Sequence, residues 1–341
     1  APDQQAKSTA PARVSTLFCC KLGYGCSVMW FLSVYQRFTI PLLAVLGILS
    51  VQAQVWAEPV VALGHVKWIH GSPDCSKGID PPIQVFQQDK STWVLRQNKC
   101  LSFEAPFMYL LLGDDRALLL DTGATDNPES FPLLTTVRSL IGERSLLVLH
   151  SHSHGDHRRG DTQFSGQTGV ELVAPNAASL RAFLDKADGT GSDRSIELGG
   201  REVIVIETPG HQEESITLYD SQTRWLLTGD TVYPGLIYVK DWQAYRESIS
   251  RLASFAQSHE LAAVLGAHIE MTDKAGEYYP IGTVYQPHEA PLPLSPEVLQ
   301  TLDKALAKAN GKETVPLDEL VVQPMNALQR TLSNVARFLT Q

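Results

Sequence analysis

Three histidines and one aspartate fall within six consecutive residues of the 341-residue chain: His152, His154, Asp156 and His157. Imidazole nitrogens and carboxylate oxygens are the ligands that zinc and related divalent metals accept. His152 and His154 are two residues apart and cannot share one helix face, whereas an extended or turning segment can direct both at one ion. Asp156 and His157 are adjacent and point apart, which suits a second ion. The run predicts a metal-binding loop, since a tract of solvated histidines would not contain an aspartate or follow an apolar segment.

Further candidate ligands follow three later apolar segments. His211 comes after residues 203–207, Asp230 after residues 225–228, and His268 after residues 262–265. Taken singly, such residues are more often structural, but ligands at corresponding ends of several strands can converge on one sheet edge, where loops carry function. Together with the first motif they make seven ligands, which suits a two-metal centre with ions about 3.5–4 Å apart. His150 lacks a spacing partner, so we expect it to be a packed or supporting histidine.

The elements that position these residues form two rounds of alternating strands and helices. The first round has strands from Ile83 and at residues 92–95, 108–112, 116–120 and 146–149, with helices at residues 127–142 and 176–187. The second round has strands at residues 203–207, 215–219, 225–228 and 262–265, with a helix at residues 241–257. A Pro-rich link then leads to a helix at residues 296–310 and an amphipathic segment at residues 325–339.

These motifs resemble the metallo-β-lactamase fold superfamily, and within it the glyoxalase II-like (hydroxyacylglutathione hydrolase and lactonase) metallohydrolases. The resemblance runs from about Ile83 to His268 and rests on HSHSHGDH, TPGH, TGDT and GAH. It implies an α/β fold, a four-layer αββα sandwich with a short C-terminal helical extension. The expected domains are an N-terminal extension with signal peptide (1–57), the hydrolase domain (58–290) and the C-terminal helical extension (291–341).

The resemblance also implies a role for each ligand. One ion would be held by His152, His154 and His211, the other by Asp156, His157 and His268, with Asp230 bridging them and Asp121 supporting the loop. We expect two divalent ions, zinc in the first place, with iron and manganese as alternatives because His/Asp sites accept all three. Water on a catalytic zinc ionises at a pKa of roughly 7, and the resulting hydroxide would attack an acyl carbon. Asp156 and Asp230 would then offset part of the metal charge and orient the nucleophile.

Three further residues are candidates for contact with a substrate. Tyr233, three residues beyond Asp230, would donate to the developing oxyanion, as the similarly placed tyrosine does in lactonases of this superfamily; the alternative is an aromatic ring that packs on the loop. Arg158 and Arg159 would either meet a substrate carboxylate or face water.

The predicted function is dinuclear metal-dependent hydrolysis of an acyl bond in a thioester, ester or lactone. Asp230 favours this type, because β-lactamases of the fold lack the bridging carboxylate, but an exported metallo-β-lactamase stays as the alternative. The C-terminal segment matches the glutathione-binding helical domain of glyoxalase II poorly. His154 stands where a diiron oxidoreductase of the fold carries Glu, which argues against that class. A non-catalytic metal-binding protein is the alternative of another class.

The net charge indicates which partners to expect, and the N-terminal segment indicates the cellular compartment. The net charge of −9 without a basic cluster argues against nucleic acid and leaves a small acyl substrate as the expected partner. Residues 38–51 form an apolar run after Arg37 that is too short to span a bilayer comfortably, and small residues follow it. We therefore expect a signal peptide, an exported (periplasmic or secreted) protein and no stable membrane anchor after cleavage. An uncleaved anchor is the alternative, and the oligomeric state is left open.

Two cysteines, Cys75 and Cys100, lie beyond this leader. An even pair in an exported chain predicts a disulfide, with two buried thiols as the alternative.

Overall fold

The computed structural model describes residues 62–186, 193–331 and 333. The expected signal peptide and residues 332 and 334–339 of the last amphipathic segment lie outside the described residues, whereas residues 327–331 of that segment are helical. Within the described part of the chain, no helix combines the length and apolar character needed to cross a membrane.

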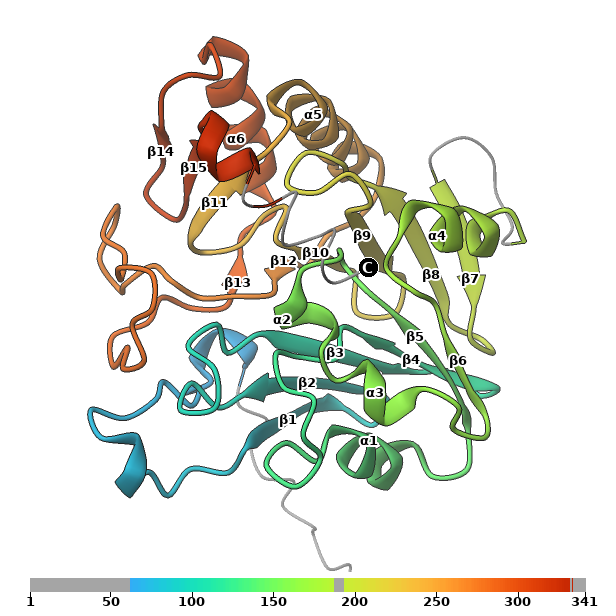
Figure 1. The fold of residues 1–341 in the computed structure, drawn as a ribbon. Helices are drawn as coiled ribbons and strands as arrows, with labels where there is room; N and C mark the ends of the chain where they lie inside the picture. Colours follow the sequence, from blue (N-terminus) through green and yellow to red (C-terminus); the bar gives the residue numbers. More distant parts are fainter. Residues whose placement is uncertain (1–61, 187–192, 332, 334–341) are drawn as a thin grey trace, which may run out of the picture. The chain divides into compact units, whose positions relative to one another are not determined.

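The first sheet has six strands in chain order (Figure 1). Its first three pairings are antiparallel, whereas β4 pairs with β5 and β5 with β6 in parallel. Since β4 and β5 run in the same direction, Asp121 and the histidine-rich loop leave the sheet at the same edge. The strands are β1 (Ile83–Asp89), β2 (Thr92–Gln97), β3 (Phe107–Leu112), β4 (Arg116–Leu120), β5 (Ser145–Leu149) and β6 (Val170–Leu172).

The second sheet has the order β13-β12-β10-β9-β8-β7. Two successive antiparallel pairings give β8 and β10 the same direction, and β10 pairs with β12 in parallel. The segments that carry His211, Asp230 and His268 therefore all leave the sheet at one edge. The strands are β7 (Asp193–Glu197), β8 (Glu202–Glu207), β9 (Ile216–Asp220), β10 (Trp225–Gly229), β12 (Ala263–Gly266) and β13 (Pro293–Leu294).

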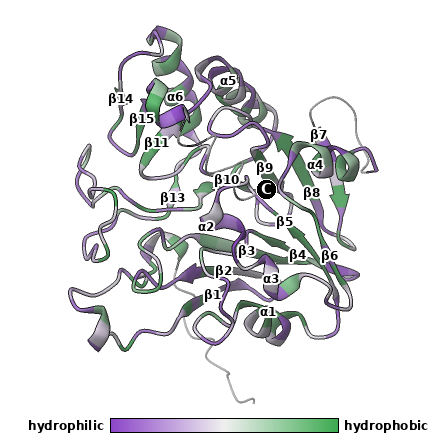
Figure 2. Cartoon of the chain, viewed as in Figure 1, coloured by the Kyte–Doolittle hydropathy of each residue, from purple (hydrophilic) through white to green (hydrophobic). Residues whose placement is uncertain are grey.

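Three apolar clusters define four layers. One cluster lies between the two sheets and includes Leu118, Leu147, Leu218 and Leu265. A second packs α1 (Leu133–Ile141) on the outer face of the first sheet, and a third packs α5 (Trp242–Ser258) and α6 (Glu297–Lys308) on the outer face of the second. Figure 2 shows the apolar colouring concentrated along the strands and helices that face these clusters. The predicted αββα sandwich is confirmed.

The C-terminal segment contributes strands as well as a helix. Strand β13 extends the second sheet, and β15 (Val321–Pro324) pairs with β11 (Leu236–Val239) and β14 (Val315–Pro316) in a third, small sheet. Apolar residues of α6 share one cluster with Ile206 and Leu226 of the second sheet. Residues 293–324 are thus packed on the sandwich.

Some element boundaries differ from those expected. The helix predicted from residue 127 begins only at Leu133, because Asn127 instead forms a turn in which its carbonyl accepts from Phe131 N and its side chain from Glu129 N. Pro132 restricts the residue before it to extended backbone, so the helix begins after it. The helix predicted at residues 176–187 is α4 (Ala177–Leu184), capped by Asn176, and residue 187 lies outside the described residues. The short helices are α2 (Gly155–Arg158), α3 (Asp161–Phe164), η1 (Leu63–His65) and η2 (Cys75–Lys77).

The predicted disulfide is present. Cys75, in η2, is bonded to Cys100, which follows β2. The bond therefore ties the irregular N-terminal part of the described chain to the loop between β2 and β3.

Candidate metal centre

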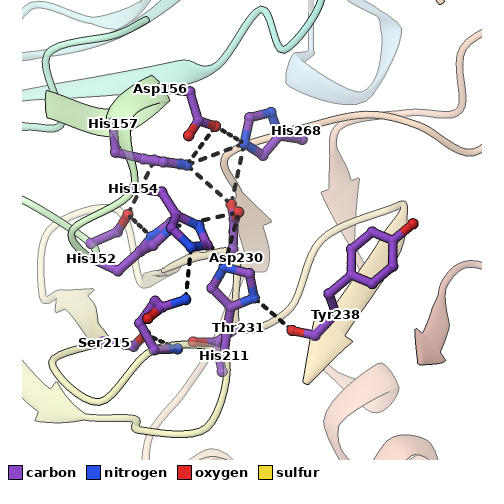
Figure 3. A network of polar contacts seen from close by, with 12 residues as sticks. His152, His154, Asp156, His157, His211, Ser215, Asp230, Thr231, Tyr238 and His268 are labelled. Carbon is purple, nitrogen blue, oxygen red and sulfur yellow. Dashed lines mark hydrogen bonds and ion pairs between the residues drawn. The ribbon is translucent and has the colours of Figure 1, made fainter. Parts of the chain in front are cut away.

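The seven predicted ligands converge at one edge of the two sheets (Figure 3). They form two groups, in each of which the ligand atoms all lie within 4.8 Å of one another. The first group is His152, His154, His211 and Asp230; the second is Asp156, His157, Asp230 and His268.

Asp230 belongs to both groups and presents one carboxylate oxygen to each. Its Oδ2 lies 3.7 Å from His152 Nε2 and 3.6 Å from His211 Nε2. Its Oδ1 lies 3.5 Å from His157 Nε2 and 3.3 Å from His268 Nε2. This is the placement expected of a bridging carboxylate, and in Figure 3 Asp230 lies between the two groups.

Local backbone structure separates the ligands of the histidine-rich loop. His152 lies in a bend after β5, and His154 is the N-cap residue of α2 with extended backbone angles. Asp156 and His157 fall in the first turn of α2, and the centroid of the His157 ring lies 4.1 Å from that of His152. One short loop thereby supplies ligands to both groups.

Each ligand histidine has a hydrogen-bond partner for one ring nitrogen, which orients the ring and leaves the other nitrogen facing the cluster. The partners are Ser151 Oγ for His152 Nδ1 (3.2 Å), Gln212 Nε2 for His154 Nε2 (2.7 Å), Asp121 Oδ2 for His157 Nδ1 (2.9 Å), Tyr238 O for His211 Nδ1 (2.7 Å) and Glu104 O for His268 Nδ1 (3.0 Å).

Asp121 supports the histidine-rich loop through three hydrogen bonds. Its Oδ1 accepts from Ser151 N at 2.7 Å, and its Oδ2 accepts from Ser151 Oγ at 2.8 Å as well as from His157. Its φ of 68° is uncommon for a residue with a side chain and is maintained by these three bonds. The support that the resemblance implied is therefore visible in the contacts of Asp121.

The inner atoms of the cluster fit divalent ions. His152 Nε2 and Asp230 Oδ1 are buried and have no hydrogen-bond partner among the described residues. His211 Nε2 lies 3.1 Å from His154 Nδ1, and His268 Nε2 lies 3.2 Å from His157 Nε2. Two nitrogen lone pairs at such distances repel each other unless a proton or a cation lies between them. Imidazole and carboxylate donors in this number are the set that zinc, iron and manganese accept.

The two groups differ in electrostatics. Burial lowers the pKa of His152 and His211 and lowers the pKa of His154 to about 3, so these three rings are neutral ligands. Burial also opposes charge on His157 and His268, but the carboxylates of Asp156 and Asp230 outweigh it and hold both pKa values well above that of an ordinary histidine.

The other candidate residues have partners of their own. The buried Tyr233 hydroxyl donates to Leu236 O at 2.8 Å and contacts Glu270 Oε2 at 3.2 Å, and the ring lies edge-on to His268. Its proposed role toward an oxyanion stays a prediction. Arg158 Nε donates to Ser153 O, and Arg159 is exposed; their contact with a substrate also stays a prediction.

His150 is a packed histidine, as expected. Its Nδ1 lies 3.1 Å from Val173 O, and its Nε2 lies 2.8 Å from Asp161 Oδ1. Neither nitrogen faces the metal centre.

Four supporting residues were not predicted from the sequence. Ser151 and Gln212 each adjoin a ligand, which is a weak signal by itself. Glu104 and Tyr238 act through backbone carbonyls, which every residue type supplies, so no sequence signal exists for them.

The family of the chain follows from comparison with known proteins. Residues 102–282, more than half of the chain, match the Metallo-beta-lactamase superfamily. The chain therefore belongs to this superfamily. The prediction of a metallo-β-lactamase-fold hydrolase is confirmed for the family and the fold, and the two His/Asp groups are consistent with a dinuclear metal site.

Its relatives include proteins named hydroxyacylglutathione hydrolase and acyl-coenzyme A thioesterase. A hydroxyacylglutathione hydrolase of Rhodopseudomonas palustris is 27% identical over 143 residues, covering 41% of this chain and 55% of the relative. A hydroxyacylglutathione hydrolase of Rhizobium meliloti is 30% identical over 155 residues, covering 42% and 59%. The acyl-coenzyme A thioesterase MBLAC2 of Gallus gallus is 27% identical over 210 residues, covering 48% and 72%. The chain thus spans only 55–59% of the length of the two hydroxyacylglutathione hydrolases.

Among solved structures, a metallo-beta-lactamase from Pontibacter korlensis is similar over 67% of this chain and 100% of its own length, with 18% identity and a TM-score of 0.47.

Proposed function

We propose that this protein is a dinuclear metal-dependent hydrolase that cleaves an acyl bond in a thioester, ester or lactone. The observation that carries the proposal is Asp230, which presents one oxygen to each group of three ligands. Zinc is the metal we propose for both groups. The names of the relatives, hydroxyacylglutathione hydrolase and acyl-coenzyme A thioesterase, support the same class of reaction.

The chain's own residues would orient the reactants. Divalent ions in this centre would lower the pKa of a coordinated water and polarise the substrate carbonyl. Asp230 and Asp156 are acceptors that can take a hydrogen bond from the nucleophilic water and so fix its direction of attack. Asp156 Oδ2 lies 3.1 Å from His157 Nε2 and 3.3 Å from His268 Nε2, which places it at the centre of the second group.

A cavity beside the His211 loop offers room for part of the substrate. Its volume is about 510 Å³, within the range of small-molecule sites. It is lined by Pro209, Gly210, Gln212, Glu213, Lys240, Asp241, Trp242, Gln243, Ala244 and Arg330.

A substrate panel on zinc-loaded protein tests the proposal. We expect turnover of a thioester, an aryl ester or a homoserine lactone with kcat/KM at least about 100-fold above that for nitrocefin. Asp230→Ala should abolish this turnover. A preference for nitrocefin would instead support the β-lactamase alternative, and two bound zinc ions without turnover of any acyl substrate would support the non-catalytic alternative.

We also propose that residues 1–57 direct export to the periplasm or the exterior. The Cys75–Cys100 disulfide supports this, because such bonds persist in oxidising compartments. Cell fractionation followed by N-terminal sequencing should find a mature chain that begins near residue 58; full-length protein in the cytosol would contradict the proposal.

A further inference from the structure

Gln212 lies against a metal ligand from a different loop. It follows His211 directly, but its side chain reaches His154, with the amide nitrogen 2.7 Å from His154 Nε2. The residue is only 1% exposed. Its backbone is fixed as well, because Gln212 N donates to Ser215 Oγ and its carbonyl accepts from Gly210 N. The amide is therefore held in place beside the ring.

The contact has a chemical consequence for His154. The nitrogen of His154 that faces the cluster is Nδ1, which lies 3.1 Å from His211 Nε2. A nitrogen that binds a metal carries no proton, so the neutral ring must carry its proton on Nε2. That proton points at Gln212 and needs an acceptor, because a buried donor without one costs about 1–3 kcal/mol.

The side-chain amide can supply this acceptor. The nitrogen and oxygen ends of an amide have nearly the same size, and a half-turn about the last torsion angle exchanges them without moving other atoms. Gln212 Oε1 is at present a buried atom without a hydrogen-bond partner among the described residues. After the half-turn, this oxygen would accept the Nε2 proton of His154.

Ser333 is compatible with that orientation. Its hydroxyl lies 3.2 Å from the amide atom of Gln212 that faces His154. A hydroxyl can accept from a nitrogen or donate to an oxygen, so it supports the amide in either orientation. Through this contact the C-terminal segment reaches the first ligand group.

We propose that Gln212 is a positioning residue that accepts the Nε2 proton of His154 and thereby fixes the tautomer that presents Nδ1 to a metal ion. This inference rests on the proposed metal-binding function of His154. Partners of this kind change metal affinity by about 10–100-fold when they are removed. The effect should be confined to the first group, because His157 and His268 are held by Asp121 and Glu104.

The test combines a tautomer measurement with zinc affinity. In the zinc-loaded wild-type protein, imidazole ¹⁵N–¹H correlation spectra should show His154 with its proton on Nε2. Gln212→Met keeps the length of the side chain but removes the acceptor, so it should lose this tautomer preference and bind one of two zinc ions about 10–100-fold more weakly. Gln212→Glu offers only acceptor oxygens and should keep both the tautomer and an affinity within about threefold of wild type.

Three results would overturn the inference. They are a proton on Nδ1 of His154 in the zinc-loaded wild type, a Gln212→Met variant that binds both zinc ions as the wild type does, and a Gln212→Glu variant that is as weak as Gln212→Met. The wild-type spectrum decides the first point even if a variant does not fold. A wild-type protein that binds no zinc would overturn the proposed function together with this inference.

Discussion

Asp121 and Asp230 both lie at the metal centre, and their contacts distinguish a supporting carboxylate from a metal ligand. The carboxylate oxygens of Asp121 accept hydrogen bonds from Ser151 and from His157 Nδ1. The oxygens of Asp230 instead face the inner nitrogens of both ligand groups. The sequence motifs placed both residues correctly because each follows a strand that ends at the same edge. Gln212 was not predicted, because its partner His154 is 58 positions away and no motif joins them.

At the residue scale, Tyr233→Phe separates a structural hydroxyl from a catalytic one. The hydroxyl already donates to Leu236 O, so we expect kcat to fall less than about tenfold and stability to fall by about 1–2 kcal/mol. Steady-state kinetics and urea unfolding measure the two effects. A loss of about 100-fold or more in kcat with unchanged stability would instead show that the hydroxyl stabilises an oxyanion.

At the scale of elements, the strands that carry ligands were predictable, whereas the polar strand β7 and the very short strands were not. Strands β4, β5, β8, β10 and β12 are mostly buried and apolar, which makes them visible in the sequence. Strand β7 is largely polar, and β11, β13, β14 and β15 are at most four residues long, so their pairing depends on tertiary contacts. The sequence thus predicts the first sheet from β1 to β5 and the second sheet around β8, β9, β10 and β12.

Helix α5 packs against the loop that carries His211. Gly210 allows the backbone of this loop to lie close to the backbone of α5 at Tyr245. Gly210 has φ of 143°, and a Cβ there would lie 2.4 Å from Tyr245 Cα. We therefore expect Gly210→Ala to displace His211 and to lower the zinc content of the first ligand group by at least about tenfold. Gly166→Ala is the control, since Gly166 also has positive φ but no atom within 4 Å of its Cβ position. Equal zinc content and stability in both variants would contradict this account.

The buried ion pair of Arg201 and Asp220 joins the two sheets. Arg201 bonds both oxygens of Asp220 at 2.7 Å and also donates to Ser91 O and Leu112 O of the first sheet. Burial raises the pKa of Asp220, but the bonds and charge of Arg201 outweigh it, so the pKa is lowered overall. The stabilisation is therefore present above the ordinary aspartate pKa of about 3.9 and is lost as the pH falls through the lower folded value.

Asp220→Asn leaves the Arg201 charge without its partner, so it should destabilise the fold by about 3–5 kcal/mol at pH 7 and remove this contribution to acid unfolding. Urea unfolding between pH 7 and pH 3 measures both effects. Glu260→Gln, which breaks the exposed pair with Arg224, should change stability by at most about 1 kcal/mol. Similar losses in the two variants would show that burial of the pair is unimportant.

At the scale of the whole molecule, the disulfide should stabilise the fold without serving the metal centre. It closes a loop with a sequence separation of 25 residues, which corresponds to about 3 kcal/mol of chain entropy. The Cys75→Ser/Cys100→Ser double variant should therefore lose about 3 kcal/mol in urea unfolding and keep its zinc content. Loss of zinc from the folded double variant would contradict this, because it would show that the disulfide holds the loop that orients His268.

The position of bound metal tests the central claim most directly. Zinc anomalous diffraction from crystals of the zinc-loaded protein should show two ions per chain, one bound by His152, His154 and His211 and one by Asp156, His157 and His268, with Asp230 touching both. Ions at other positions, or a single ion that leaves one group without metal at saturating zinc, would contradict the dinuclear centre and the hydrolytic function proposed from it.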